Sequence, residues 1–446
     1  MKDLTKGNIT RLIVGFAVLL LLGNIFQLFY NLADTRIVGE FISENALGAV
    51  GATSALNSVI IGFLNGLTNG FSIITARYFG AKDYGKMRKS IGLSLTLGLG
   101  TSAVFTVLSV IFTEPLLKLL NTPAEILGQA KSYIIIIFIG MTVTMLYDIC
   151  SSVLRAIGDT VSPLIFLIIS TIINIVLDLI FIVVFHWGVW SAGFATVISQ
   201  AVSVVLCLIY ILKKHKELIP SPEDFRFDAG MAGNMYATGV SMGLMISLVG
   251  IGTVVMQGSI NNFGTQIIVA HTTARKITDI FFLPLSVFGM ASATFSSQNL
   301  GAGKIDRVKK GLVQTTLITW GWSALVIFLS FFCTPFFVHL ITGIDNPEIV
   351  SVVTKYMKVN TSFYFILDIV IIFRNALQGV GDKISPIASS VLELVGKCLV
   401  AGFLAPKLGY FGIIISEPLV WIGMAVILGF GLMFNKTLGL KKFRKS

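Results

Sequence analysis

A few acidic and polar side chains lie inside long apolar stretches of this sequence, and these residues could do chemistry. An ionisable side chain at membrane depth is costly, so it usually faces protein or water and indicates a functional site. Four such residues form one candidate group: Asp34, Asn174, Asp178 and Thr196.

The chemistry of this group is that of a cation site. Asn174 and Asp178 are four residues apart, so they lie on one face of a helix. Carboxylate, amide and hydroxyl oxygens are hard donors that suit Na⁺ and bind zinc or copper poorly. Two carboxylates in a low dielectric also repel, which makes one of them a candidate proton carrier. We therefore expect coupling to Na⁺ or H⁺. The alternatives are a structural hydrogen bond between helices for any one member, and a helix cap at the membrane surface for Asp34.

The elements that position these residues are expected to be membrane-spanning helices. The chain has 446 residues, of which 55% are hydrophobic and 12% charged, and its mean hydropathy is +0.88. Soluble proteins average about 25% charged residues, and a helix needs about 20 apolar residues to cross a bilayer. The sequence predicts an all-α polytopic membrane protein with about twelve spans: 11–36, 46–77, 90–113, 132–154, 162–186, 190–212, 231–260, 264–298, 311–333, 355–378, 384–405 and 409–435.

The basic residues indicate topology. The net charge is +11, and most Lys and Arg residues fall in segments on the same side as the N-terminus. This asymmetry is the positive-inside pattern, which places both termini in the cytoplasm. It argues against nucleic acid as a partner.

Two motifs occur twice in the same order. Segment 76–89 resembles segment 297–310, with a Gly-Ala pair before a basic run, and segment 154–163 resembles 377–386. We therefore expect two parallel six-span halves, the architecture of a transporter with a central cavity. The predicted parts are an N-terminal lobe at 1–212 with the cation site, a cytoplasmic linker at 213–230 and a C-terminal lobe at 231–446.

Glycines predict close packing and turns. GxxxG steps in two spans favour helix contact, and glycines that end helices can support tight turns. The packing glycines are Gly62, Gly66, Gly70, Gly239 and Gly243, and the turn glycines are Gly80, Gly158, Gly301 and Gly381.

The motifs together resemble the multidrug and toxic compound extrusion (MATE) family. The resemblance rests on the segment from Tyr30 to Gly39, the two repeated turns and the pair Asn174 and Asp178, and it covers nearly the whole chain. It implies two six-helix lobes, alternating access and export of organic, often cationic compounds driven by Na⁺ or H⁺. In that family the counterparts of Asp34, Asn174, Asp178 and Thr196 form the cation site.

One departure concerns the seventh span. NorM-like members carry an acidic residue there, whereas this chain has Gln257, Asn261 and Asn262. The chain therefore looks closer to the DinF-like or MepA-like branches, and we expect no second coupling site of the NorM kind.

The second half does not copy the cation site. The repeat aligns Asn174 with Lys397, Asp178 with Ala401 and Thr196 with Glu417. Charged side chains in its spans either pair with each other or line a substrate cavity. Glu393 with Lys397, and Arg275 with Asp279, have the i,i+4 spacing of an ion pair. Asp368 and Glu417 have no obvious local partner, which favours them for a cationic substrate. The substrate-cavity candidates are Arg275, Asp368, Glu393, Lys397 and Glu417.

The leading hypothesis is a Na⁺- or H⁺-coupled antiporter that exports small organic molecules, with no other cofactor. We expect a monomer in a bacterial inner membrane. The alternative is a flippase for a lipid-linked saccharide, whose phosphates Arg275 and Lys397 could hold. An enzyme is not expected because the sequence has no HExxH, GxSxG or Walker A motif.

Overall fold

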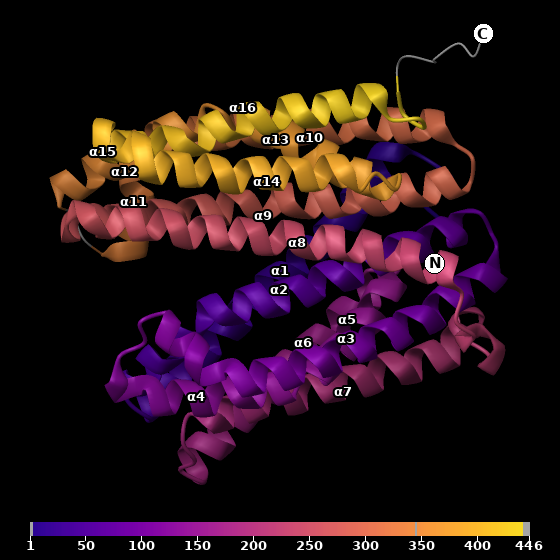
Figure 1. Cartoon of the computed structure of the whole chain (residues 1–446), viewed down its shortest axis with the longest axis horizontal. Helices are drawn as coiled ribbons and strands as arrows, with labels where there is room; N and C mark the ends of the chain where they lie inside the picture. Colours follow the sequence, from indigo (N-terminus) through magenta and orange to yellow (C-terminus); the bar gives the residue numbers. More distant parts are fainter. Residues whose placement is uncertain (1–2, 344–345, 440–446) are drawn as a thin grey trace. The chain divides into compact units, whose positions relative to one another are not determined.

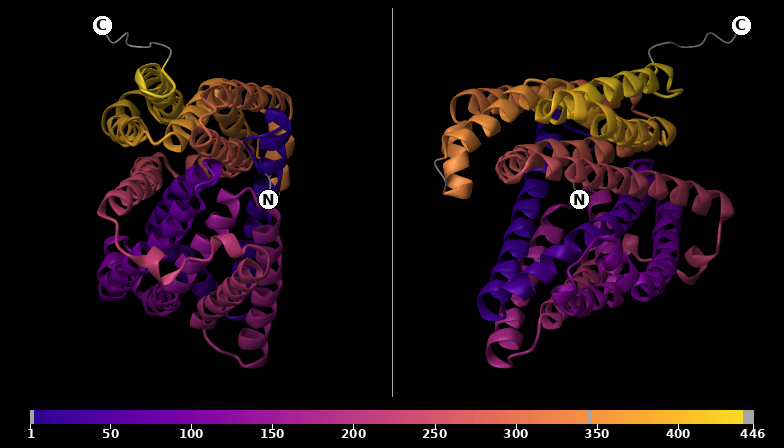
Figure 2. Two further views of the ribbon diagram at one scale, coloured as in Figure 1. Left: turned by 90° about the vertical axis from the view of Figure 1, so that its right-hand side faces the viewer. Right: turned by 60° about the vertical axis from the view of Figure 1, so that its left-hand side comes forward.

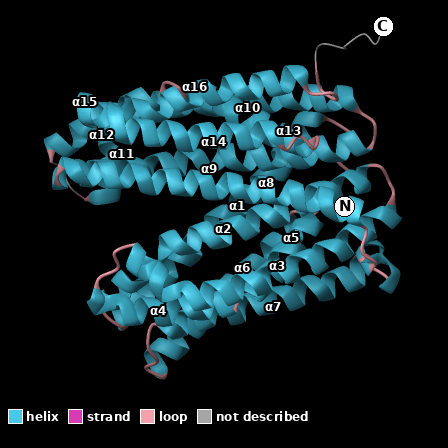
Figure 3. Cartoon of the chain, in the orientation of Figure 1, coloured by secondary structure: helices cyan, strands magenta, loops and turns pink. Residues whose placement is uncertain are grey.

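A computed structural model describes residues 3–343 and 346–439. Every regular element in this part of the chain is a helix (Figures 1 and 3). The elements are α1 (Ile9–Phe41), α2 (Glu44–Gly80), α3 (Tyr84–Leu119), α4 (Ala124–Ile139), α5 (Met141–Ala156), α6 (Val161–Asp178), η1 (Leu179–Val184), α7 (Trp190–Lys214), η2 (Lys216–Leu218), η3 (Pro222–Phe225), α8 (Ala229–Ile260), η4 (Asn261–Phe263), α9 (Thr265–Gly301), α10 (Ile305–Phe332), α11 (Thr334–Thr342), α12 (Pro347–Thr361), α13 (Tyr364–Gly379), α14 (Ile384–Leu399), η5 (Val400–Leu404), α15 (Ala405–Leu408) and α16 (Tyr410–Phe434).

The predicted spans are present as helices. Within the described residues, ten helices are long and apolar enough to cross a membrane, and up to twelve are if each bent pair counts as one span. The bent pairs are α4 with α5, at 47°, and α12 with α13, at 53°. The predicted spans 132–154 and 355–378 each correspond to one of these bent pairs.

Both bends occur at the same place in the repeat. One lies at Gly140 and the other at Phe363, each the same number of residues before the repeated leucine, Leu154 or Leu377. A Cβ at Gly140 would collide with the side chain of Val197 on α7, so glycine lets the bent pair approach that helix. The bend is therefore a feature that the two halves share at corresponding positions.

Helix packing repeats in the two halves. In the first half, α2 packs against α3, α4 and α5, while α7 packs against α5 and α6. In the second half, α9 packs against α10, α12 and α13, while α16 packs against α13 and α14. These are the corresponding helices, so the sequence repeat reflects a structural repeat.

The repeated turn has one hydrogen-bond pattern. The Asp159 carboxylate accepts from the backbone N–H and hydroxyl of Ser162 at 3.0 and 2.7 Å, and Asp382 accepts from those of Ser385 at 3.1 and 2.9 Å. The expected turn glycines Gly158 and Gly381 have φ of +83° and +91°.

The other pair of turns uses different residues from those expected. Gly80 and Gly301 end their helices with ordinary dihedrals, and the positive φ falls two residues later, at Lys82 and Gly303.

The chain divides into two compact units, and the division falls inside α1 and α8. Unit 1 contains residues 1–3 and 18–247, and unit 2 contains 4–17 and 248–446. This division differs from a boundary at the linker, because the first part of α8 packs closely on α2. A Cβ at Gly66 would lie 2.5 Å from the Gly243 Cα, and a Cβ at Gly70 would collide with Gly239. The two predicted GxxxG stretches therefore contact each other.

The N-terminal segment is held by the basic run of the second half, within unit 2. The Leu4 N–H donates to Gln298 Oε1 at 3.1 Å. The Lys304 ammonium donates to the Thr5 carbonyl at 2.8 Å, and Arg307 donates to the Gly7 carbonyl at 3.0 Å. These basic residues therefore fix the chain just before α1.

The linker between α7 and α8, which carries η2 and η3, is attached to α3 within unit 1 (Figure 2). Arg88 pairs with Asp224 at 3.5 Å, and Lys89 pairs with Asp228 at 3.0 Å. A Cβ at Gly92 would lie 2.8 Å from the Asp224 carbonyl oxygen, so the linker lies directly on the helix.

We predict that Gly66→Ala destabilises the protein, because the added methyl group must displace the backbone of α8. Overpacking of this kind costs about 1–3 kcal/mol. Thermal unfolding of the purified protein in detergent measures the effect. Gly100→Ala is the control, since a Cβ there meets nothing within 4 Å, and it should leave the melting temperature unchanged or raise it. Equal melting temperatures for the two variants would contradict this packing.

A second prediction concerns the pH dependence of the linker contact. The Met231 backbone N–H and then the Lys89 ammonium bond to the Asp228 carboxylate, which holds its pKa below the ordinary value of 3.8. A carboxylate with a lowered pKa in the folded state adds stability above its unfolded pKa and loses it as pH falls through the folded value. Asp228→Asn should therefore slightly lower the melting temperature at pH 7, and the difference from wild type should shrink below pH 3.8.

The exposed Glu223 of η3 provides the control for this titration. Glu223→Gln should follow the wild-type melting curve at every pH. A difference between Asp228→Asn and wild type that stays constant down to pH 3 would show that the Asp228 charge does not hold the linker.

Candidate functional site

The predicted cation residues lie in unit 1, on three helices. Asp34 is on α1, Asn174 and Asp178 are on α6, and Thr196 is on α7. Asn174 and Asp178 are fully buried, and Asp34 is 6% exposed. The first, fifth and sixth spans of the half therefore contribute to one interior region.

The Asp34 and Asp178 side chains lie close enough for each to affect the ionisation of the other. Neighbouring carboxylates in low dielectric cannot both hold a full, uncompensated charge, because like charges repel strongly there. A proton or a cation between them removes the repulsion. Two neighbouring buried carboxyl groups are therefore chemically suited to take up a proton or a cation.

Several polar atoms of the group lack hydrogen-bond partners within residues 3–343 and 346–439. They are Asp34 Oδ1, both carboxylate oxygens of Asp178, and Oδ1 and Nδ2 of Asn174. A buried polar atom without a partner costs about 1–3 kcal/mol, and more if it is charged. Such an unsatisfied set of oxygens fits a bound cation chemically, since Na⁺ coordinates hard oxygen atoms.

Tyr30 was not among the predicted site residues, although it belongs to the group. Its hydroxyl donates to Thr196 Oγ1 at 2.9 Å. The same hydroxyl also feels the charges of Asp34 and Asp178. The signal for it was its spacing, because Tyr30 is one turn before Asp34 on the same helix face. Thr196 is thus joined to the site through Tyr30.

Helix α6 changes form next to the site. Asp178 is its last α-helical residue, and the π-helical segment η1 follows. In the second half α14 passes in the same way into η5. π-helical turns occur frequently at functional sites, and this one directly follows a site carboxylate.

Asp148 on α5 is a further acidic residue that sequence reasoning missed. It is 9% exposed, and its Oδ2 has no hydrogen-bond partner in the described part of the chain. Its position inside the predicted span 132–154 was the signal, since any acidic residue at membrane depth indicates function.

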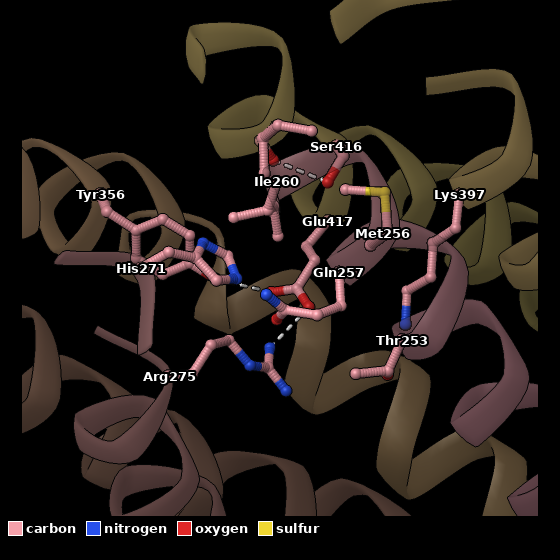
Figure 4. Close-up of a pocket in the computed structure, with 11 residues that line it drawn as sticks. Thr253, Met256, Gln257, Ile260, His271, Arg275, Tyr356, Lys397, Ser416 and Glu417 are labelled. Atoms are coloured by element: carbon pink, nitrogen blue, oxygen red, sulfur yellow. Dashed lines mark hydrogen bonds and ion pairs between the residues drawn. The ribbon is translucent and has the colours of Figure 1, made fainter. Parts of the chain in front are cut away.

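Three of the five candidates in the second half line one cavity, which lies within unit 2. Arg275, Lys397 and Glu417 border it together with Gln257 and Tyr356, and its volume is about 50 Å³. Figure 4 shows Arg275, Gln257 and Glu417 directed toward one another, with Lys397 on the side away from Tyr356.

Glu417 is well paired, so the reason for favouring it as a cation-binding residue is wrong. Arg275 Nη1 donates to its Oε1 at 2.7 Å. Asn360 Nδ2 and the Tyr356 hydroxyl donate to Oε2 at 3.1 and 3.3 Å. These partners come from α9 and α12, far from Glu417 in sequence. The expected i,i+4 pair of Arg275 with Asp279 is also present, at 3.5 Å.

Asp368 and Glu393 do not border this cavity. Asp368 is fully buried on α13 and accepts from the Ser323 hydroxyl at 2.7 Å. Glu393 pairs with Lys397 at 2.9 Å, which confirms that expected pair, and with Arg374 at 3.5 Å. Arg374 was not among the candidates. The second half therefore combines a salt-bridge network with a charged cavity wall.

Known proteins resemble this chain over most of its length. The family model described as MatE matches residues 20–180 and 237–401. The chain is 25% identical over 391 residues to the probable multidrug resistance protein YpnP of Bacillus subtilis (strain 168), covering 88% of this chain and 87% of YpnP. It is 24% identical over 437 residues to the FAD transporter of Shewanella oneidensis, covering 96% and 95%.

A solved structure has the same fold. It is described as the outward-facing conformation of a multidrug resistance MATE family transporter of the MOP superfamily. The TM-score is 0.87 at 20% identity, and the likeness covers 97% of each chain.

We predict that Glu417→Gln destabilises unit 2, because Arg275 loses its closest carboxylate. The expected cost is about 1–3 kcal/mol, measured by thermal unfolding in detergent. Asp279→Asn is the matched control, since its side chain is 69% exposed and exposed pairs contribute little. If Asp279→Asn destabilises the protein as much as Glu417→Gln, the cavity pair has no special role.

Proposed function

Because this chain belongs to the MatE family, we propose that it is a multidrug exporter in which Na⁺ or H⁺ entry through the site of Asp34 and Asp178 drives efflux of organic compounds. The names of relatives such as YpnP support multidrug substrates. The observation that carries the coupling proposal is the proximity of two buried carboxyl groups, whose oxygens Asp34 Oδ1, Asp178 Oδ1 and Asp178 Oδ2 lack hydrogen-bond donors among the described residues.

Coupling follows from the energetic cost of placing two buried carboxylates next to each other. With no cation bound, the two charges repel and oppose any conformation that brings them together. A proton or Na⁺ removes the repulsion, so the ion binds this conformation more tightly than one in which the carboxylates separate or meet water. A ligand shifts a conformational equilibrium by its differential affinity for the two states. The ion gradient can thereby bias the alternation between inward and outward access.

The two ions would use the group differently. A proton can be shared between the Asp34 and Asp178 carboxyl groups alone. Na⁺ needs several oxygens, and the neighbouring Asn174 carbonyl and Thr196 hydroxyl would supply two more. Tyr30 would position Thr196 through its 2.9 Å hydrogen bond.

The flippase alternative has less support. It needs room for a phosphate-linked saccharide, and the cavity that Arg275 and Lys397 border has a volume of only about 50 Å³. The bacterial inner membrane, cytoplasmic termini, a monomeric state and a place near the DinF-like and MepA-like branches stay predictions.

Transport by reconstituted protein tests the coupling. Proteoliposomes loaded with ethidium should export it faster under an inward Na⁺ or H⁺ gradient than without one. Asp34→Asn and Asp178→Asn should each reduce the gradient-driven part of the rate about tenfold or more, since coupling factors are typically about 5–150. Which gradient drives wild type identifies the ion.

Glu40→Gln is the matched control, because Glu40 is an exposed acid on the same helix, paired with Arg36 at 3.3 Å. It should transport like wild type. Wild-type efflux that is indifferent to both gradients, or full coupling in both aspartate variants, would refute the proposal.

A further inference from the structure

The cavity of unit 2 occupies the position in its half that the cation site occupies in unit 1. Its wall includes residues of α8, α14 and α16, the first, fifth and sixth spans of the second half, together with residues of α9 and α12. The cation site comes from α1, α6 and α7, the same spans of the first half. Lys397 aligns with Asn174 and Glu417 with Thr196, so the repeat has placed different chemistry in an equivalent place.

The substitution reverses the charge that this place can accept. The Lys397 ammonium stands where the first half has the neutral Asn174 amide, and the side chain is 5% exposed. Its stem passes Gly252 on α8, where a Cβ would lie 2.8 Å from the Lys397 Cδ. The α8 residues that border the cavity are all uncharged: Thr253, Met256, Gln257 and Ile260. The covalently attached ammonium of Lys397 thus stands in the second half where the first half has a proposed binding site for a free cation.

The single acidic residue of the wall, Glu417, is already satisfied. It accepts from Arg275, Asn360 and Tyr356, so it offers little to an added cation. A second cation would also meet repulsion from Arg275 and Lys397.

The donors, by contrast, are in excess. Arg275 has five N–H groups in a planar fork, and its ion pairs with Glu417 and Asp279 leave others available. The Lys397 ammonium has three donors, one of which reaches Glu393. Two cations, Arg275 and Lys397, and one anion, Glu417, line the cavity, while Asp279 and Glu393, which pair with those cations, lie outside its lining.

The size of the cavity limits the ligand to one small group. Its volume is about 50 Å³, whereas a pocket for a whole drug has about 300–1,000 Å³. One water needs about 10–15 Å³ measured in this way, so the space suits a few waters or one carboxylate. The rest of a larger molecule would lie outside it.

From these observations we propose that the unit 2 cavity is a substrate subsite that binds one carboxylate group, paired with Arg275 and Lys397. The inference rests on the proposed export of organic compounds and adds a substrate class: molecules that carry a carboxylate, zwitterions included. Unit 1 binds the coupling cation, and unit 2 discriminates in favour of an acid.

Binding of two dyes that differ in one group tests the subsite. Rhodamine 110 carries a free carboxylate, and rhodamine 123 is its methyl ester. Fluorescence anisotropy with the purified full-length chain in detergent at pH 7, without any ion gradient, gives both dissociation constants. We expect wild type to bind the acid about tenfold more tightly than the ester, the order of a charge-assisted contact.

Variants locate the preference. Arg275→Gln and Lys397→Gln should each weaken binding of the acid and leave that of the ester nearly unchanged, while Lys397→Arg, which keeps the charge, should retain most of the preference. Lys276→Gln is the matched control, because Lys276 is an exposed cation next to Arg275 on α9 and does not border the cavity. It should bind both dyes like wild type.

The wild-type comparison needs no variant to fold. Equal affinity of wild type for acid and ester, or binding of neither dye, overturns the subsite, and so does a Lys276→Gln variant that loses the preference as fully as Lys397→Gln. Asp34→Asn should keep the preference for the acid. Failure of ion coupling in proteoliposomes would therefore leave this result intact, and the two proposals can fail separately.

Discussion

A charge inside an apolar helical protein must be neutralised, and the two halves of this chain meet that constraint in opposite ways. In unit 1, Asp34 and Asp178 lie close to each other, and Asp34 Oδ1 and both Asp178 oxygens have no hydrogen-bond donor among the described residues. In unit 2, Arg275 neutralises Glu417 and Lys397 neutralises Glu393. In our proposal the first half uses a mobile ion for this purpose, whereas the second half contains its own counter-ions. Lys397 and Glu417 align with Asn174 and Thr196 of the first half, so equivalent positions of a repeated fold carry different chemistry.

Much of this organisation could be predicted, because it depends on properties of single residues and short spacings. Apolar runs long enough to cross a bilayer define helices without any knowledge of their partners. The repeated turn was visible because an aspartate three residues before a serine caps the next helix locally, as Asp159 and Asp382 do. Asn174 and Asp178 could be paired because i,i+4 spacing fixes their common face.

Other features depend on contacts between distant segments and could not be predicted. Glu417 has no oppositely charged partner close to it in sequence, because Arg275 lies 142 residues away. No proline or glycine lies at the bend before Tyr364, so the sequence does not indicate it. The division of the chain inside α1 and α8 follows from packing against other helices. Tyr30 could have been found from its spacing to Asp34, but the hydroxyl of Thr196 that it reaches belongs to α7.

The anchoring of the N-terminal segment has a consequence for biosynthesis. Leu4 is held by Gln298, 294 residues later in the chain. At a translation rate of about 5–20 residues per second, the ribosome needs roughly 15–60 s to make the intervening chain. The segment that leads into α1 is thus made long before the residue that holds it. Until the end of α9 emerges, the insertion machinery or lipid must accommodate the helix that carries Asp34, and a chain truncated before that point would leave its start unsecured.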